Sequence, residues 1–242
     1  MRSSLAARWH DRATLAWAPS RGAHARGTIS GMRIGAPTTA PGATPSASLL
    51  ERAERVFLPQ YRSPGLPDGL PWGERNGNCG PASIVNALRL VGLDVPGFAG
   101  ERTQAVIDAA RRLATGSSES TGATLKTQQA FALRAAGADV HVTYGLGTAL
   151  ADVRAGAVLL LGGDRAARSW PRRADDGAST AVANHAAVVA GYDEADGRYV
   201  VIDPALAGPV RVDAAQIAAF AQADAAGSMP RLGLLVRAPA RG

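Results

Sequence analysis

The sequence has little that would stabilise a fold covalently or bind a metal. Only one of its 242 residues, Cys79, is a cysteine, so no intramolecular disulfide can form. No Cys-x-x-Cys pair and no histidine cluster has the spacing of a metal site. We therefore expect no metal and no cofactor. A single cysteine is either an inert core residue or a reactive thiol, and composition by itself favours the core residue.

Long apolar runs are also missing. No segment approaches the roughly 18–20 apolar residues that span a bilayer. The basic N-terminus lacks the apolar centre of a secretory signal peptide. We expect a soluble protein of the cytoplasm, with export through a leader in the N-terminal tail as the alternative.

Positive charge is concentrated in one part of the chain. The formal net charge is +6, and residues 1–48 hold six arginines against one acidic residue, Asp11. The remaining residues carry 20 basic and 19 acidic side chains. This nearly neutral part shows no basic stripe, so we do not expect a nucleic-acid partner. Lys126 is the only lysine, which we attribute to a compositional preference for arginine.

Composition divides the chain into three parts. Residues 1–48 are rich in Ala, Arg, Ser, Gly, Pro and Thr and have no periodicity, which predicts a disordered basic tail or leader. Residues 49–71 are predicted to be a linker or arm, in which Leu49 to Leu58 form either a short helix or an extended segment. Residues 72–242 form the predicted globular domain.

The globular part is predicted to begin with helices and to continue with strands. Between Gly80 and Val91, apolar residues recur at helical spacing, and Pro81 falls in the first turn, where its missing N–H is tolerated. Further helices are expected at 101–114, 124–136, 150–154 and 213–222. Strands are expected at 140–144, 157–161, 186–192, 198–202 and 231–236, the third and fourth joined as a hairpin by Asp-Gly. This order indicates an α+β fold with a mostly antiparallel sheet.

Cys79 stands where the Pro- and Gly-rich loop meets the first strong helix. The start of a helix presents unpaired N–H groups and a partial positive charge, which favour a thiolate. Gly77 and Gly80 keep side chains away from the sulfur. The backbone N–H of Cys79 is also a donor that a developing oxyanion needs. Its position before the apolar face of the helix offsets the compositional preference for a core residue, so a reactive thiol and a packed cysteine both stay open here.

A thiol nucleophile needs a base, and the sequence offers four histidines. His10 and His24 belong to the predicted tail. His141 lies within a predicted strand and is expected to be solvated. His185 begins the hairpin and is anchored by an apolar strand, which makes it the candidate base, with a satisfied edge histidine as the alternative.

Asp203 is the candidate partner of that histidine. It directly follows the second strand of the hairpin, which returns to where the first strand begins, so its carboxylate is expected near His185. The alternative is an ordinary turn aspartate before Pro204. Asp193 and Asp196 lie at the opposite end of the hairpin and are weaker candidates.

These three segments together resemble a known family. Asn-Cys-Gly-Pro-Ala-Ser at 78–83, Asn-His-Ala-Ala-Val-Val at 184–189 and Val-Ile-Asp-Pro at 201–204 resemble the papain-like cysteine peptidase clan, and most closely its bacterial double-glycine leader peptidase-like branch. The resemblance implies a thiolate–imidazolium pair, an acyl-enzyme intermediate and a peptide or protein substrate.

One position departs from the family pattern. The family usually has a glutamine about six residues before the cysteine, as a side-chain donor to the oxyanion, and this chain has Gly73 there. Asn76 and Asn78 are the candidate substitutes, because a carboxamide donates in the same way.

The main hypothesis is therefore a cysteine peptidase with Cys79, His185 and Asp203 as its triad. The alternatives are a deamidase, transglutaminase or acyltransferase of the same fold acting as a bacterial toxin or effector, and a catalytically degenerate binding module.

Overall fold

The computed structural model describes residues 47–60, 77–118, 123–164, 167–170, 184–222 and 233–240. The chain divides into Met1–Thr44 and Pro45–Gly242. Residues 1–46 of the predicted tail at 1–48 lie outside the described residues, as do Trp72, Gly73 and Asn76.

Helices precede most of the strands, as the sequence predicts, and the fold is α+β. Within the described residues the helices are α1 Leu49–Val56, α2 Cys79–Leu90, α3 Gln104–Thr115, α4 Lys126–Ala135, α5 Leu146–Arg154 and α6 Ala214–Gln222. The strands are β1 Asp139–Thr143, β2 Val158–Asp164, β3 Asn184–Asp193, β4 Arg198–Ile202, β5 Val210–Val212 and β6 Gly233–Arg237. None of these helices is both long and apolar enough to cross a membrane.

The strands form one sheet in the order β1-β6-β2-β3-β4-β5, and its neighbours pair antiparallel. The predicted hairpin is β3 and β4, and its register pairs Val188 with Ile202. Ile202 is the last residue of β4, and it pairs with Val188, the fifth residue of β3. The first residues of β3, His185 among them, therefore extend past the end of β4. This offset leaves room beside the start of β3 for the segment that follows β4.

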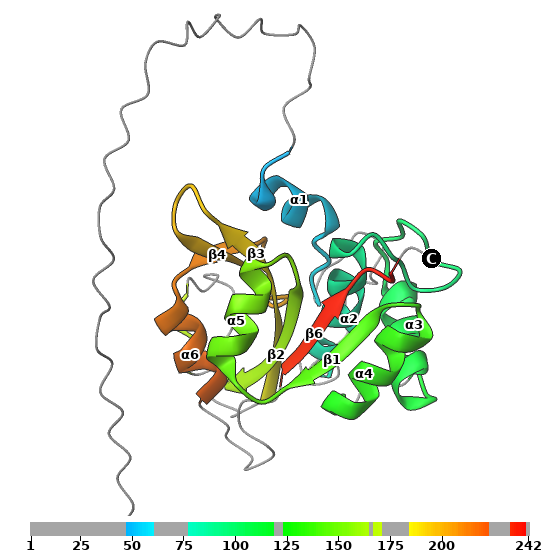
Figure 1. Cartoon of the computed structure of the whole chain (residues 1–242). Coiled ribbons are helices and arrows are strands. Elements are labelled where there is room, and N and C mark those ends of the chain that lie inside the picture. The colour runs from blue at the N-terminus through cyan, green and yellow to red at the C-terminus, as the bar shows by residue number, and fades with distance from the viewer. Residues whose placement is uncertain are drawn as a thin grey trace, which may run out of the picture. The chain divides into compact units, whose positions relative to one another are not determined.

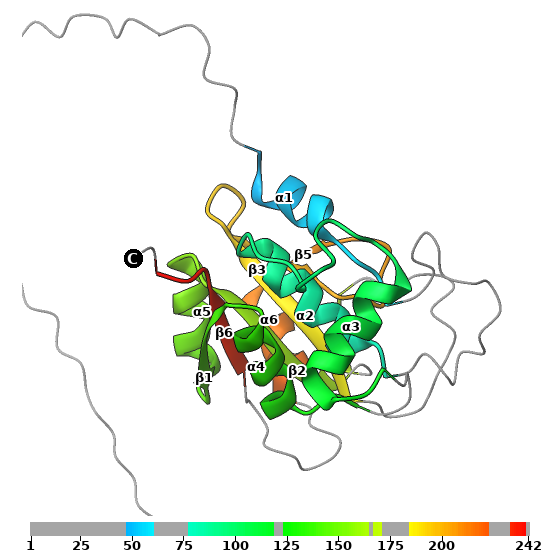
Figure 2. The same cartoon turned by 90° about the vertical axis from the view of Figure 1, so that its right-hand side faces the viewer.

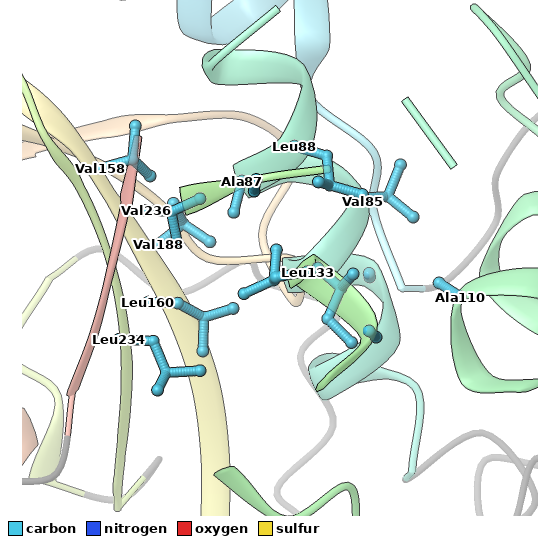
Figure 3. Packing of buried hydrophobic residues seen from close by; sticks show 14 of the residues in the cluster. Val85, Ala87, Leu88, Ala110, Leu133, Val158, Leu160, Val188, Leu234 and Val236 are labelled. Atoms are coloured by element: carbon cyan, nitrogen blue, oxygen red, sulfur yellow. The ribbon is translucent and has the colours of Figure 1, made fainter. Parts of the chain in front are cut away.

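Helices cover both faces of the sheet. Helices α2, α3 and α4 lie on one face, and α5 and α6 lie on the other (Figures 1 and 2). Because side chains alternate along a strand, Leu160 and Val188 face α2, whereas Leu161 and Ala187 face the α5 and α6 side. The larger core lies between α2 and the sheet, where apolar side chains of both interdigitate (Figure 3).

Helix α2 is the central helix, and all of its residues from Cys79 to Leu88 are buried. A helix that is buried on all sides needs partners for its polar side chains. Asn86 is one of them: its Oδ1 accepts from the backbone N–H of Leu58 at 2.7 Å, and its Nδ2 donates to the Leu58 carbonyl at 3.0 Å. This double hydrogen bond fixes the segment after α1 against α2.

The segment at 49–60 packs on the globular part. Ser48 and Glu51 form a capping box that starts α1. Leu49 lies against Gly191 of β3, where a Cβ would come within 2.9 Å of the Leu49 side chain. The Gln60 N–H donates to the carbonyl of Pro204 at 2.7 Å. The predicted arm therefore reaches the turn that contains Asp203.

Candidate active site

Cys79 is the first residue of α2, and its side chain is buried. Backbone N–H groups of Gly80 and Ala186 donate to its sulfur, and the side chain of His185 is hydrogen-bonded to it. The thiol thus sits between the start of the central helix and the start of β3.

His185 is the second residue of β3 and is 5% exposed. Its Nε2 lies 2.6 Å from Oδ1 of Asp203. Because Nε2 is engaged by the carboxylate, Nδ1 is the ring nitrogen left for Cys79. The ring edge also meets Phe220 of α6, with centroids 6.3 Å apart and the planes near perpendicular. These contacts hold the imidazole in one orientation.

The carboxylate of Asp203 is fully buried and surrounded by donors. Oδ1 accepts from His185 and from the backbone N–H of Ala205 at 2.9 Å. Oδ2 accepts from Nε1 of Trp170 at 3.1 Å and from the guanidinium of Arg168. A buried charge is tolerated only when it is paired and hydrogen-bonded, and both conditions are met here.

The electrostatics of the three residues favour charged forms. Burial would raise the pKa of Asp203, but the facing His185, Arg168 and Trp170 outweigh it and hold that pKa well below its usual range. Burial would lower the pKa of His185, yet the charge of Asp203 and the hydrogen bonds to Asp203 and Cys79 raise it to about 9. Burial opposes ionisation of Cys79, and the hydrogen bond and charge of His185 more than compensate, so the pKa of the thiol is lowered. The arrangement favours the pair of thiolate and imidazolium over the pair of neutral thiol and neutral imidazole.

The two asparagines proposed as oxyanion donors have different outcomes. Asn76 lies outside the described residues. Asn78 is buried directly before Cys79, and its Oδ1 accepts from the guanidinium of Arg111 at 2.9 Å. Arg111 also donates to the carbonyl of Gly77. Arg111 of α3 therefore fixes the chain on which the thiol is carried and adds a positive charge near it.

Sequence reasoning missed several residues of this site. Arg168 and Trp170 bind Asp203 from the segment between β2 and β3. Arg111 and Lys126 were treated as ordinary basic residues. Their signal was weak: only the scarcity of lysine singles out Lys126. His141, in contrast, is exposed on β1 beside Asp139, as predicted for a solvated histidine.

The described residues contain no group of His, Cys, Asp and Glu side chains that would hold a metal ion.

Comparison with known proteins gives limited similarity. No protein-family model matches the sequence, and no curated protein matches it. Among solved structures, a crystal structure from Bacillus anthracis described as a "putative C39-like peptidase" is similar: it is 14% identical, the match covers 78% of this chain and 97% of that chain, and the TM-score is 0.49.

Proposed function

We propose that this chain is a papain-like cysteine peptidase in which Cys79 is the nucleophile, His185 the general base and Asp203 the residue that orients it. The observation that carries the proposal is the continuous chain of contacts from the Cys79 sulfur through the His185 ring to the buried Asp203 carboxylate. An activated nucleophile is recognised by such a base, oriented in turn by a third group. An inert core cysteine requires none of these partners.

In the proposed reaction the Cys79 thiolate attacks the carbonyl carbon of a peptide bond. The His185 imidazolium then gives its proton to the leaving amine, and an acyl-enzyme with a new thioester bond remains. Water, deprotonated by the now neutral His185, attacks the thioester, the C–S bond breaks, and the acid product leaves as the Cys79 thiolate and the His185 imidazolium are restored. Asp203 keeps its charge throughout and stabilises the imidazolium.

The oxyanion of each tetrahedral intermediate needs hydrogen-bond donors. The backbone N–H of Cys79 belongs to the first turn of α2, where N–H groups have no partner within the helix. We assign it as one donor. Asn76 and Asn78 stay candidates for a second.

The lowered pKa of the Cys79 thiol supports an enzyme over a degenerate binding module, because a binding module has no use for an activated thiol. Deamidation, transglutamination and acyl transfer would begin with the same attack on an amide. They differ from hydrolysis of a peptide bond in the amine that leaves and in the molecule that finally accepts the acyl group.

Incubation with a library of proteome-derived peptides, followed by mass spectrometry, tests the proposal. The wild-type protein should create new peptide termini, and Cys79→Ala should create none. His141→Ala, at an exposed histidine on β1, which β6 and β2 separate from β3 in the sheet, is the matched control and should cleave normally. Equal cleavage by Cys79→Ala would refute the proposal. A one-dalton gain or a cross-link in place of cleavage would indicate one of the other amide reactions.

A further inference from the structure

Lys126 is the only lysine among 26 basic side chains, and it lies at the candidate active site. It is the first residue of α4, the helix that packs beside α2 over the sheet. Its side chain is half-buried and crosses β2 at Gly162, where Cε and Nζ lie 3.1 and 3.6 Å from the position of a Gly162 Cβ. Gly162 is therefore the residue that makes room for this side chain.

The position over Gly162 is next to the thiol. Gly162 pairs directly with Ala186 of β3, and side chains of paired residues point to the same face of a sheet. The backbone N–H of Ala186 donates to the Cys79 sulfur. The Lys126 ammonium group, carried by α4, and the Cys79 sulfur, carried by α2, therefore both lie against the pair Gly162 and Ala186.

A buried amide holds the lysine in place. Oε1 of Gln129 accepts from Lys126 Nζ at 3.0 Å, and Nε2 of Gln129 donates to the carbonyl of Thr124 at 3.1 Å. Gln129 and Thr124 pack so closely on Gly80 that a Cβ there would come within 2.9 and 2.6 Å of them. The hydrogen-bonded group of Lys126, Gln129 and Thr124 therefore packs against Gly80, the residue that follows Cys79.

The negative charge that a partly buried ammonium group needs nearby is provided for Lys126 by the Cys79 thiolate. Burial lowers the pKa of Lys126 to about 7, and the negative charge of Cys79 acts in the opposite direction. Among the described residues, Gln129 Oε1 is the acceptor that Nζ binds, and an ammonium has three N–H donors. A partly buried ammonium is stable when an anion is nearby. Within the described part of the chain, the charged or titratable groups near the sulfur are Arg111 of α3, Lys126 of α4 and His185 of β3, with Asp203 and Arg168 behind the histidine.

We propose that Lys126 is a further catalytic residue, an ammonium group that stabilises negative charge first on the Cys79 sulfur and then on the carbonyl oxygen of the tetrahedral intermediate. The inference rests on the proposed function and extends it. A cation in this place supplies the oxyanion stabilisation for which this chain lacks the usual glutamine. Electrostatic groups aimed at the charge of a transition state are among the strongest contributors to catalysis.

Alkylation of the single cysteine by iodoacetamide, followed over pH by intact mass, tests the inference without a known substrate. Lys126→Met keeps an unbranched side chain, one heavy atom shorter, and removes the charge, and it should move the midpoint of alkylation upward by about one pH unit. Lys126→Arg keeps the charge and should leave the midpoint close to that of the wild type. Lys126→Gln replaces the methionine variant if that variant does not fold, as judged by circular dichroism.

The second readout is the rate at one cleavage site of the peptide library. Loss of the ammonium should lower kcat about 100-fold or more with KM nearly unchanged, because the lost interaction belongs to the transition state. A wild-type midpoint and a wild-type kcat in Lys126→Met would overturn the inference.

His185→Gln separates this failure from failure of the proposed function. If it raises the midpoint while Lys126→Met does not, the Cys79–His185 pair stands and only the role of Lys126 is wrong. If neither variant changes an ordinary thiol midpoint, the pair itself is wrong, and both proposals fall.

Discussion

Asp203 accepts hydrogen bonds from donors in three separate parts of the chain, and two of the donors carry or share positive charge. Asp203→Asn keeps the shape of the side chain and removes its charge. The change leaves the buried Arg168 without its counter-ion and the His185 ring without the partner that orients it. We expect kcat to fall by a factor on the order of 10²–10⁴ and the free energy of unfolding to fall by about 3–5 kcal/mol.

Cleavage rates and urea denaturation measure these two effects. Asp213→Asn is the matched control, because Asp213 is exposed and caps α6 through an oxygen that asparagine retains. An Asp203→Asn protein with normal turnover would show that the carboxylate has no part in orienting His185.

The sequence predicts some of these residues and not others for a physical reason. Cys79 and His185 each stand at the start of a periodic apolar segment, so local pattern reveals them. Arg168 and Trp170 reach Asp203 from 35 and 33 residues earlier in the chain, and no local pattern encodes that contact. Lys126 is similarly hidden, since its role depends on how α4 packs beside α2.

At the scale of elements, α6 packs on β2 without room for even a methyl group. A Cβ at Gly163 would overlap the backbone carbonyl of Phe220, and Gly163 pairs with His185 in the sheet. Gly163→Ala should therefore displace α6, take Phe220 from the His185 ring, and lower the free energy of unfolding by about 1–3 kcal/mol or more.

Gly208→Ala is the control for this change, because nothing lies within 4 Å of a Cβ built there. Thermal denaturation of both variants measures the difference in stability, and cleavage rates report on His185. Equal melting temperatures for the two variants would contradict the described packing of α6.

Element prediction succeeded where the segments are long and periodic. The helix after Asn78 and the hairpin of β3 and β4 were predicted with nearly the observed limits. Strand β5 was not, because its three residues are too few to show alternation, and pairing with β4 determines it. The capping box at Ser48 and Glu51 is a sequence signal that would have fixed the start of α1.

At the scale of the whole molecule, the buried His185–Asp203 pair links stability to pH. In Cys79→Ala the thiolate is gone, and the pKa of His185 stays raised by Asp203. A group with a raised pKa in the folded state stabilises the fold fully below its unfolded pKa of about 6.5, and this contribution is lost as pH rises through the folded value. The His185 pKa of about 9 in the wild type sets the upper limit of this effect. We expect the free energy of unfolding of Cys79→Ala to fall by on the order of 1–3 kcal/mol between pH 6 and 10.

Denaturant titrations across this pH range test the linkage. The double variant Cys79→Ala, His185→Gln should lack the slope, because glutamine does not titrate. If the free energy of unfolding depends on pH to a similar degree in both proteins, His185 is not the group that causes the dependence. In the wild type the lowered pKa of Cys79 acts in the opposite direction, so the slope should be smaller there.

The proposed activity requires that Cys79 and His185 form a charged pair. Ultraviolet absorbance of the thiolate is the most direct test of that pair. The chain has one cysteine, so the difference between wild type and Cys79→Ala reports on this thiol only. We predict a titration midpoint below the ordinary value of about 8.5 and an upward shift in His185→Gln. A midpoint at or above the ordinary value, unchanged by His185→Gln, would contradict the account.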